Sequence, residues 1–247
     1  MAVLFVYFGL LVIVVGVVST LRPLRRFGIG NRKRAAAVLA LGVLILAFGA
    51  TLPAGLIVVQ NPALRLDDFA PAYQFNEVHT IEVDAPPELA YRAIKRVTAG
   101  EIRLFRTLTW IRSPRLGAGK ESILAPPPDE PLLDVATRSG FLLLADLPPR
   151  ELVFGTVDVG PPLHVDKPTP QDFMRFNRPG YAKVTLNFTV LPRAGGGSTV
   201  RTETRVYATN ASARRRFAAY WRVIFPGSAI IRVMWLRAIK ERAERHG

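Results

Sequence analysis

The sequence predicts an α+β domain that follows two membrane-spanning helices. Two long stretches without a charged side chain occupy most of residues 1–60. Further along, several short segments alternate between apolar and polar residues, as half-buried strands do. The last forty residues carry apolar side chains at intervals of three and four, which is typical of a long helix with one buried face.

The two uncharged stretches are residues 1–21 and 35–59. About 20 apolar helical residues are needed to cross a hydrocarbon layer ~30 Å thick, and both stretches meet that length. Pro53 predicts a kink or an end of the second helix near the membrane interface. Residues 1–21 lack the positive n-region and small-residue cleavage site of a signal peptide. We therefore expect two spanning helices rather than one cleaved leader.

The loop between these helices, residues 22–34, contains six Lys and Arg and no acidic residue. Short basic loops stay in the cytoplasm. The expected protein is therefore an integral, two-pass protein of the cell membrane, with its C-terminal domain outside the cytoplasm. The lipid bilayer is its first expected partner.

The net charge of +14 is unevenly distributed. The loop carries +6, residues 61–209 carry +1, and residues 210–247 carry +7. The high pI thus comes from two segments and not from a generally basic surface. Because no nucleic-acid readout motif accompanies them, we expect no nucleic-acid partner.

Cysteine is absent, which excludes disulfides, thiol nucleophiles and Cys-ligated metal centres. The three histidines, His79, His164 and His246, are too scattered to predict a His-rich metal centre. No G-x-S-x-G or phosphate-loop motif is present. We therefore assign no catalytic residue and expect no metal or cofactor.

The outer part of the chain begins with residues 61–74, which read as an irregular linker because of Pro62 and Pro71. Residues 77–83 alternate and are β-branched, so they predict a strand. Pro86 and Glu88 then mark a helix start, and an apolar i, i+4 repeat carries a short helix to about Val97. Residues 101–108 predict a second short helix.

The middle of the domain predicts one or two helical turns over residues 132–138 and buried strands at 141–147 and 151–159. Residues 160–179 contain five prolines and read as loop. Residues 181–191 and 198–209 form the clearest hairpin. A long helix follows, with Asn210 as its N-cap, and Pro226-Gly227 predicts a kink or break within it.

This order of elements, with the motif HTIEVDAPPELAYRAI at residues 79–94, resembles the START-like (SRPBCC, helix-grip) superfamily over residues 75–247. The segments PGYAKVTLNF (179–188), TETRV (202–206) and YWRVIFPGS (220–228) resemble a membrane-anchored branch of it. The resemblance implies a curved antiparallel sheet wrapped around the long C-terminal helix. It also implies an apolar cavity between sheet and helix that often holds a lipid or another hydrophobic molecule.

On this basis we expect a membrane-anchored domain that binds a lipid or another apolar or amphipathic small molecule, without catalysis. Two alternatives stay open: a cyclase- or dehydratase-like enzyme of the same superfamily, and a structural or partner-binding module with a filled core. The oligomeric state is left open. The candidate cavity-lining aromatic residues are Trp110, Phe141, Phe154, Phe188, Phe217, Trp221 and Trp235.

Two polar sets complete the candidates. Glu203 and Arg205 lie two apart on one predicted strand, so they share a face. They form either a polar centre inside the cavity or a solvated, cross-paired strand face. The basic side chains Arg214, Arg215, Arg216 and Arg222 are candidates for binding anionic lipid head groups, the alternative being a solvated helix face.

Overall fold

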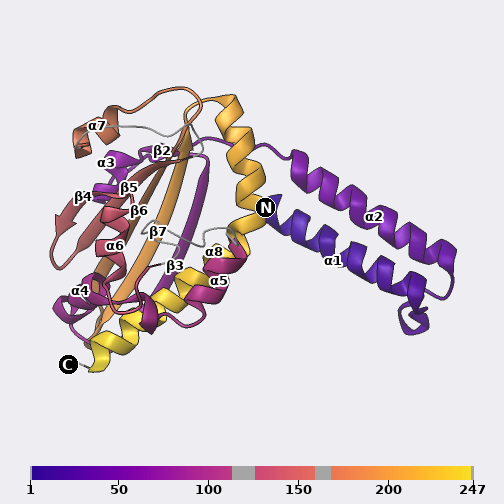
Figure 1. The fold of residues 1–247 in the computed structure, drawn as a ribbon, viewed down its shortest axis with the longest axis horizontal. Helices are drawn as coiled ribbons and strands as arrows, with labels where there is room; N and C mark the ends of the chain where they lie inside the picture. The colour runs from indigo at the N-terminus through magenta and orange to yellow at the C-terminus, as the bar shows by residue number, and fades with distance from the viewer. Residues whose placement is uncertain (1, 113–125, 159–167, 246–247) are drawn as a thin grey trace. The chain divides into compact units, whose positions relative to one another are not determined.

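The computed structural model describes residues 2–112, 126–158 and 168–245. The chain divides into two compact units. One contains residues 1–54 together with 218–225, and the other contains residues 55–217 together with 226–247. The structure is mixed α+β, with a five-stranded antiparallel sheet, a long C-terminal helix and two N-terminal apolar helices (Figure 1).

The first unit is built around a helical hairpin. Helices α1 (Ala2–Leu21) and α2 (Arg32–Thr51) are each 20 residues long, and by length and composition both are able to cross a membrane. The short 3-10 helix η1 (Arg25–Phe27) lies in the basic loop between them. Asn31 caps α2, since its side chain accepts a hydrogen bond from the Arg34 N–H at 2.8 Å.

Glycines spaced seven residues apart hold the two helices together. Gly9 and Gly16 of α1 and Gly42 and Gly49 of α2 are all buried. A Cβ added at Gly9 would lie 2.6 Å from the Leu46 backbone nitrogen, and one added at Gly42 would lie 2.7 Å from that of Ile13. The backbones thus approach too closely for any side chain at these positions, as in small-residue contacts between membrane helices.

The second helix does not extend to residue 59: it stops at Thr51, which agrees with the predicted end, and not with a kink, at Pro53. The segment predicted as an irregular linker is also ordered. It contains α3 (Arg65–Phe69) and β2 (Ala72–Tyr73), and β2 pairs antiparallel with β1 (Ile57–Val58). The prolines at 62 and 71 flank these elements instead of preventing them.

The sheet has the strand order β3-β7-β6-β5-β4, and every neighbouring pair is antiparallel. Its strands are β3 (Phe75–Val83), β4 (Leu142–Leu147), β5 (Glu151–Asp158), β6 (Ala182–Pro192) and β7 (Ser198–Ala208). All five agree with the predicted strands to within two residues at each end. The long hairpin of β6 and β7 lies at the centre.

The remaining helices are α4 (Pro87–Arg96), η2 (Ala99–Glu101), α5 (Phe105–Arg112), α6 (Leu132–Arg138), α7 (Pro170–Arg175) and α8 (Ala211–Arg245). Helix α7 was predicted as loop; Thr169 caps it by accepting from the Asp172 N–H. Asn210 caps α8 as predicted, accepting from the Ala213 N–H at 2.8 Å. At Pro226, where a kink or break was predicted, α8 is not broken but continues through the proline.

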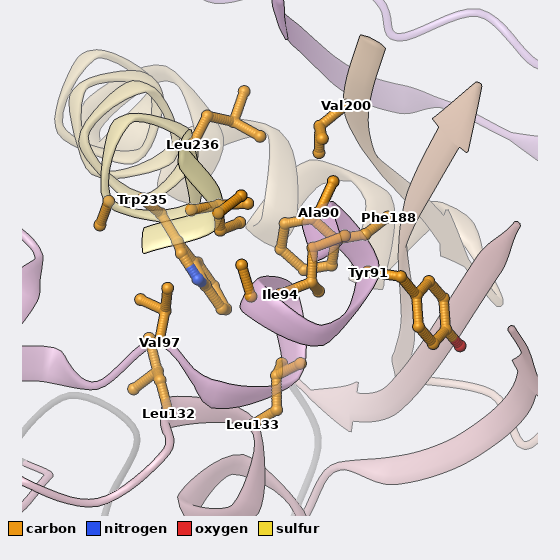
Figure 2. Close-up of a cluster of buried hydrophobic side chains, with 14 of the residues drawn as sticks. Ala90, Tyr91, Ile94, Val97, Leu132, Leu133, Phe188, Val200, Trp235 and Leu236 are labelled. Atoms are coloured by element: carbon orange, nitrogen blue, oxygen red, sulfur yellow. The ribbon is translucent and has the colours of Figure 1, made fainter. Parts of the chain in front are cut away.

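The sheet carries a hydrophobic core on each face. On one face, α4, α6 and the C-terminal part of α8 pack against β5, β6 and β7 in a cluster that includes Ile94, Leu132, Phe188, Val200 and Ile239 (Figure 2). On the other face, α3 and α7 cover β4 and β5 through Leu66, Phe69, Leu144, Val153 and Phe173. Side chains that alternate along each strand therefore enter two different environments.

Candidate functional site

The aromatic residues expected to line a cavity pack together on the α8 face. Phe154, Phe188 and Trp235 belong to the core cluster of that face, and Phe141 packs against it half-buried. The rings of Phe188 and Trp235 lie with their centroids 5.1 Å apart, and Figure 2 shows the indole among side chains of α4 and α6. Their observed role in the structure is to fill this core.

Phe217 and Trp221 are not members of this cluster. Phe217 is buried, with its ring centroid 5.0 Å from that of Phe75. Trp221 is also buried, 5.5 Å from the Phe225 ring in the same helix. Trp110 lies in α5, and its side chain is outside the described residues.

Glu203 and Arg205 share a face, as predicted, but the structure places that face opposite α8. Their strand neighbours Val200 and Val206 point the other way. Arg205 Nε donates to Glu203 Oε1 at 2.7 Å, and its Nη1 donates to Asp67 Oδ1 at 2.7 Å and to the Ala70 carbonyl at 3.1 Å. The pair therefore does not lie in a cavity between sheet and helix.

A second buried carboxylate, Glu151, extends this network across the sheet. It accepts hydrogen bonds from the Arg65 and Leu66 N–H groups at 2.7 and 3.1 Å and from Asn187 Nδ2 at 2.7 Å. Asn187 in turn accepts from the Glu203 N–H at 3.2 Å. These bonds satisfy the buried polar groups and anchor α3, so the network is a structural clamp.

The pKa of Asp67 lies below its ordinary value. Burial acts to raise it, but hydrogen bonds from the Leu64 and Ala63 N–H groups and the nearby Arg205 guanidinium outweigh that effect.

The sequence analysis did not predict two members of this network, Asp67 and Glu151. One sequence signal could have indicated such a network. Polar residues occupy alternate positions of two adjacent strands, and this row includes Glu203 and Arg205, two residues apart.

The same face of the sheet holds a pocket of about 400 Å³ beside the clamp. Its polar lining comes from Asp68, Asn177, Lys183, Thr185 and Tyr207, and its apolar lining from Leu56, Phe69, Ala70, Pro71, Ala72, Met174 and Phe176. Segments from α3, α7, β6 and β7 thus meet at one cavity. A mixed lining of this kind suits a molecule with an apolar body and a polar end.

Lys183 is the chemically distinctive residue of this pocket. It is only 8 % exposed, and its Nζ donates to the Met174 carbonyl at 3.1 Å and lies 4.8 Å from the centre of the Phe173 ring. Burial lowers the pKa of the Lys183 ammonium to about 8. No salt bridge of this ammonium is found among the described residues. An anionic or hydrogen-bond-accepting group in the pocket would therefore find an available donor.

The close approach of Phe173 to the sheet depends on a glycine. A Cβ at Gly155 of β5 would lie 2.7 Å from the Phe173 ring and 2.7 Å from the Leu144 side chain. Only glycine allows α7 to pack this closely against the strand. Gly155 therefore helps to place the ring that faces Lys183.

The basic candidates on α8 differ in their surroundings. Arg216 donates to the Ser212 hydroxyl and to the Gly180 carbonyl, both at 2.8 Å, so its guanidinium is held by its own domain. Arg215 is exposed, whereas Arg214 and Arg222 are half-buried. They do not form one uniform basic surface, and binding of head groups by them stays a prediction.

A further polar group lies between β3 and α8. Glu77 is buried, accepts from the Ser228 hydroxyl at 2.8 Å, and lies 2.8 Å from His79 Nε2. Since the carboxylate is shared by these two neighbours, this group has the features of a satisfied core cluster. No set of three or more metal-binding side chains is found in the described ranges.

Comparisons with known proteins gave fold-level similarities only. No family model and no curated protein matches the chain. Among solved structures, it is similar to protein MLL2253 of Mesorhizobium loti, with 15 % identity and a TM-score of 0.33 over 70 % of this chain and 99 % of that one. It is also similar to the di-domain ARO/CYC BexL of the BE-7585A biosynthetic pathway, with 14 % identity and a TM-score of 0.31 over 86 % and 57 %.

A third similar structure, from Nitrosospira multiformis, has 15 % identity and a TM-score of 0.26 over 63 % of this chain and 94 % of that one. With identities and TM-scores this low, the similarities assign neither a family nor a function to the chain.

Proposed function

We propose that the domain is a membrane-anchored, START-like helix-grip module that binds an amphipathic molecule with an anionic or hydrogen-bond-accepting head group. The binding site is the pocket around Lys183, on the face of the sheet opposite α8. The observation that carries this proposal is a buried lysine, in a pocket of mixed polar and apolar lining, with no acidic partner among the described residues.

The physical argument rests on the energy of a buried cation. Taking an ammonium group out of water is unfavourable unless an opposite charge or several hydrogen bonds compensate. Lys183 has one carbonyl acceptor at 3.1 Å, which leaves its other two N–H donors for a ligand. A carboxylate or phosphate in the pocket would supply the missing partner and raise the lysine pKa.

The apolar residues around the pocket support an amphipathic ligand. Leu56 and Met174 line it and are 55 % and 42 % exposed, and the adjoining Ile57 and Val58 are about half exposed. Leu56 follows the end of α2 by five residues of chain. If α2 spans the bilayer, as we propose, this short connection tethers the pocket close to the membrane from which such a ligand would come.

The proposed topology is the two-pass arrangement with residues 22–34 in the cytoplasm and the domain on the outer side. In this arrangement the ligand would be taken from the outer leaflet or the adjacent compartment. We place the site in the Lys183 pocket and not between the sheet and the C-terminal helix, because Phe154, Phe188 and Trp235 pack into a core on that face.

The test uses the full chain in phosphatidylcholine nanodiscs with a photoactivatable long-chain fatty acid. After irradiation, peptide mapping should find label on pocket residues such as Met174 and Phe176, and unlabelled fatty acid should compete with it. Lys183→Met keeps the length and apolar character of the side chain but removes the charge. It should reduce pocket labelling about tenfold, the order expected for one lost charged hydrogen bond.

Labelling of α1 and α2 is an internal control, since it reports only partitioning into the bilayer. Lys95→Met is a matched control, because Lys95 pairs with Asp146 and does not line the pocket. Pocket labelling that excess fatty acid does not displace, or that Lys183→Met leaves unchanged, would refute the proposal.

A further inference from the structure

A second cavity, of about 320 Å³, lies between α4 and the C-terminal end of α8. Among the described residues that line it are three arginines: Arg92 and Arg96 from α4, and Arg242 from α8. The other described lining residues, Leu89, Ala93 and Ala243, form an apolar floor, and none of the described lining residues is a carboxylate. The groove is on the α8 side of the sheet, so it is separate from the Lys183 pocket.

Arg92 and Arg96 are four residues apart on one helix, so their side chains project from the same face. Like charges at this spacing repel one another. Both side chains are exposed, and neither has a hydrogen bond or ion pair within the part of the chain that the structure describes. Glu88, one turn before Arg92, does not pair with it. Within the described ranges this pair of cations therefore has no counter-charge.

Arg242 is held in the groove by a fixed contact. Its Nη1 donates to both carboxylate oxygens of Glu101 at 2.8 Å, and Arg245 lies 3.3 Å from the same carboxylate. Burial acts to raise the pKa of Glu101, but hydrogen bonds from Thr98 and Arg242 bring it below its ordinary value. Glu101 is thus an anion that orients Arg242, while the three groove arginines outnumber this one carboxylate and leave an excess of positive charge.

We infer that this groove, lined by Arg92, Arg96 and Arg242, is an anion-binding site for the phosphate group of a small phosphate monoester. Guanidinium groups match the oxygens of phosphate in paired hydrogen bonds, and the excess of positive charge in the groove complements a dianion. The volume exceeds that of a phosphate group alone, and the apolar floor of Leu89, Ala93 and Ala243 suits a short carbon skeleton attached to it. The phosphate is supplied either by a soluble metabolite or by a lipid head group.

The experiment measures thermal unfolding of the full chain in phosphatidylcholine nanodiscs. Glycerol 3-phosphate should raise the midpoint in a saturable way at millimolar concentration or below, beyond the effect of sodium chloride at equal ionic strength. The double variant Arg92→Gln/Arg96→Gln should weaken this response at least tenfold. The matched control is Arg103→Gln/Arg106→Gln, which removes two exposed arginines that do not line the groove and should leave the response unchanged.

A second arm replaces the soluble probe with phosphatidic acid in the nanodisc. The phosphate belongs to a lipid if phosphatidic acid stabilises the wild type but not the Arg92/Arg96 variant, and if glycerol 3-phosphate has only a weak effect. The reverse pattern assigns the phosphate to a soluble ester. A response no larger than that to chloride in both arms, or an equal response of the groove variant and the wild type, overturns the inference. Failure of the Lys183 experiment would not affect this outcome, because the two sites share no residue.

Discussion

Arg205 and Asp67 are separated by 138 residues in the sequence, and Nη1 of the arginine donates to Oδ1 of the aspartate at 2.7 Å. Both side chains are more than nine-tenths buried. Through this contact the segment that precedes the sheet is fastened to the central strand β7. The bond accounts for the order of a segment whose composition predicts an irregular linker.

Replacing Arg205 with methionine should destabilise the domain by about 3–5 kcal/mol, because Asp67 would keep its buried charge without its arginine and Glu203 would keep only the partly exposed Arg201 as a partner. Chemical denaturation of the full chain in detergent measures the change. Arg201→Met is the matched control: it lies on the same strand face and pairs with Glu203, but its side chain is 31 % exposed. It should lose less than about 1 kcal/mol. Equal losses in the two variants would contradict the clamp.

The Phe188→Ala variant should lose about 3–5 kcal/mol, because the ring is fully buried against Trp235 and its removal leaves a cavity. The same denaturation experiment tests this value. Leu191→Ala, three residues further along β6, removes an apolar side chain that is 54 % exposed and should change stability by less than about 0.5 kcal/mol. A loss near zero for Phe188→Ala would mean that the α8 face holds a cavity instead of a packed core.

Gly42→Leu should separate α1 from α2, since even a Cβ at this position would lie 2.7 Å from the Ile13 backbone nitrogen. We expect a loss of about 1–3 kcal/mol or more, as for other overpacked contacts. Thermal unfolding in detergent, followed by helical circular dichroism, reports it. Ala40→Leu enlarges an exposed residue of the same helix and should be tolerated. Similar behaviour of the two variants would argue against the glycine contact.

The stability of the domain should rise as the pH increases from about 8 towards 10.5. Lys183 has a pKa of about 8 in the folded state against an ordinary value of 10.5. Between these values the unfolded chain binds more protons than the folded one, so raising the pH favours folding. The gain is of the order of 2 kcal/mol after allowance for partial solvation. Lys183→Met should abolish this component, and an unchanged pH profile in that variant would show that the lysine is not desolvated.

The proposed topology predicts that Ala194, in the β6–β7 turn, faces the outside, and that Phe27, in the basic loop, faces the cytoplasm. The chain has no cysteine of its own, so Ala194→Cys and Phe27→Cys each introduce a single thiol. A membrane-impermeant maleimide should label the Ala194→Cys variant in intact cells. It should label the Phe27→Cys variant only after permeabilisation. The opposite pattern would reverse the orientation.

Much of the fold follows from local patterns. The strand alternation of residues 77–83 and 181–209, and the N-cap at Asn210, depend only on residues close in the sequence, and the structure confirms them. Helix α7 was missed because five prolines between residues 160 and 179 outweigh the capping signal of Thr169 and Asp172. A break at Pro226 is absent, since α8 continues through the proline, and the part of the helix that follows it packs into the core on one face of the sheet.

Only part of the candidate site could be predicted from the sequence. The spacing of Glu203 and Arg205 puts them on one face of a strand, but it does not say which face meets the long helix. That choice depends on the partners of the alternate side chains, and these partners, Asp67 and Glu151, come from other parts of the chain. The pocket around Lys183 likewise exists only where α3, α7 and the sheet come together.

The sequence by itself determined the two apolar helices, the basic loop between them, and the strands and long helix of the domain, because hydrophobicity and periodicity act over a few neighbouring residues. Only the tertiary structure decided which polar residues are buried, where the cavities lie, and that a proline-flanked segment is ordered. Those outcomes depend on desolvation and hydrogen bonding between distant segments, since a buried charge is tolerated only where the fold supplies its partner.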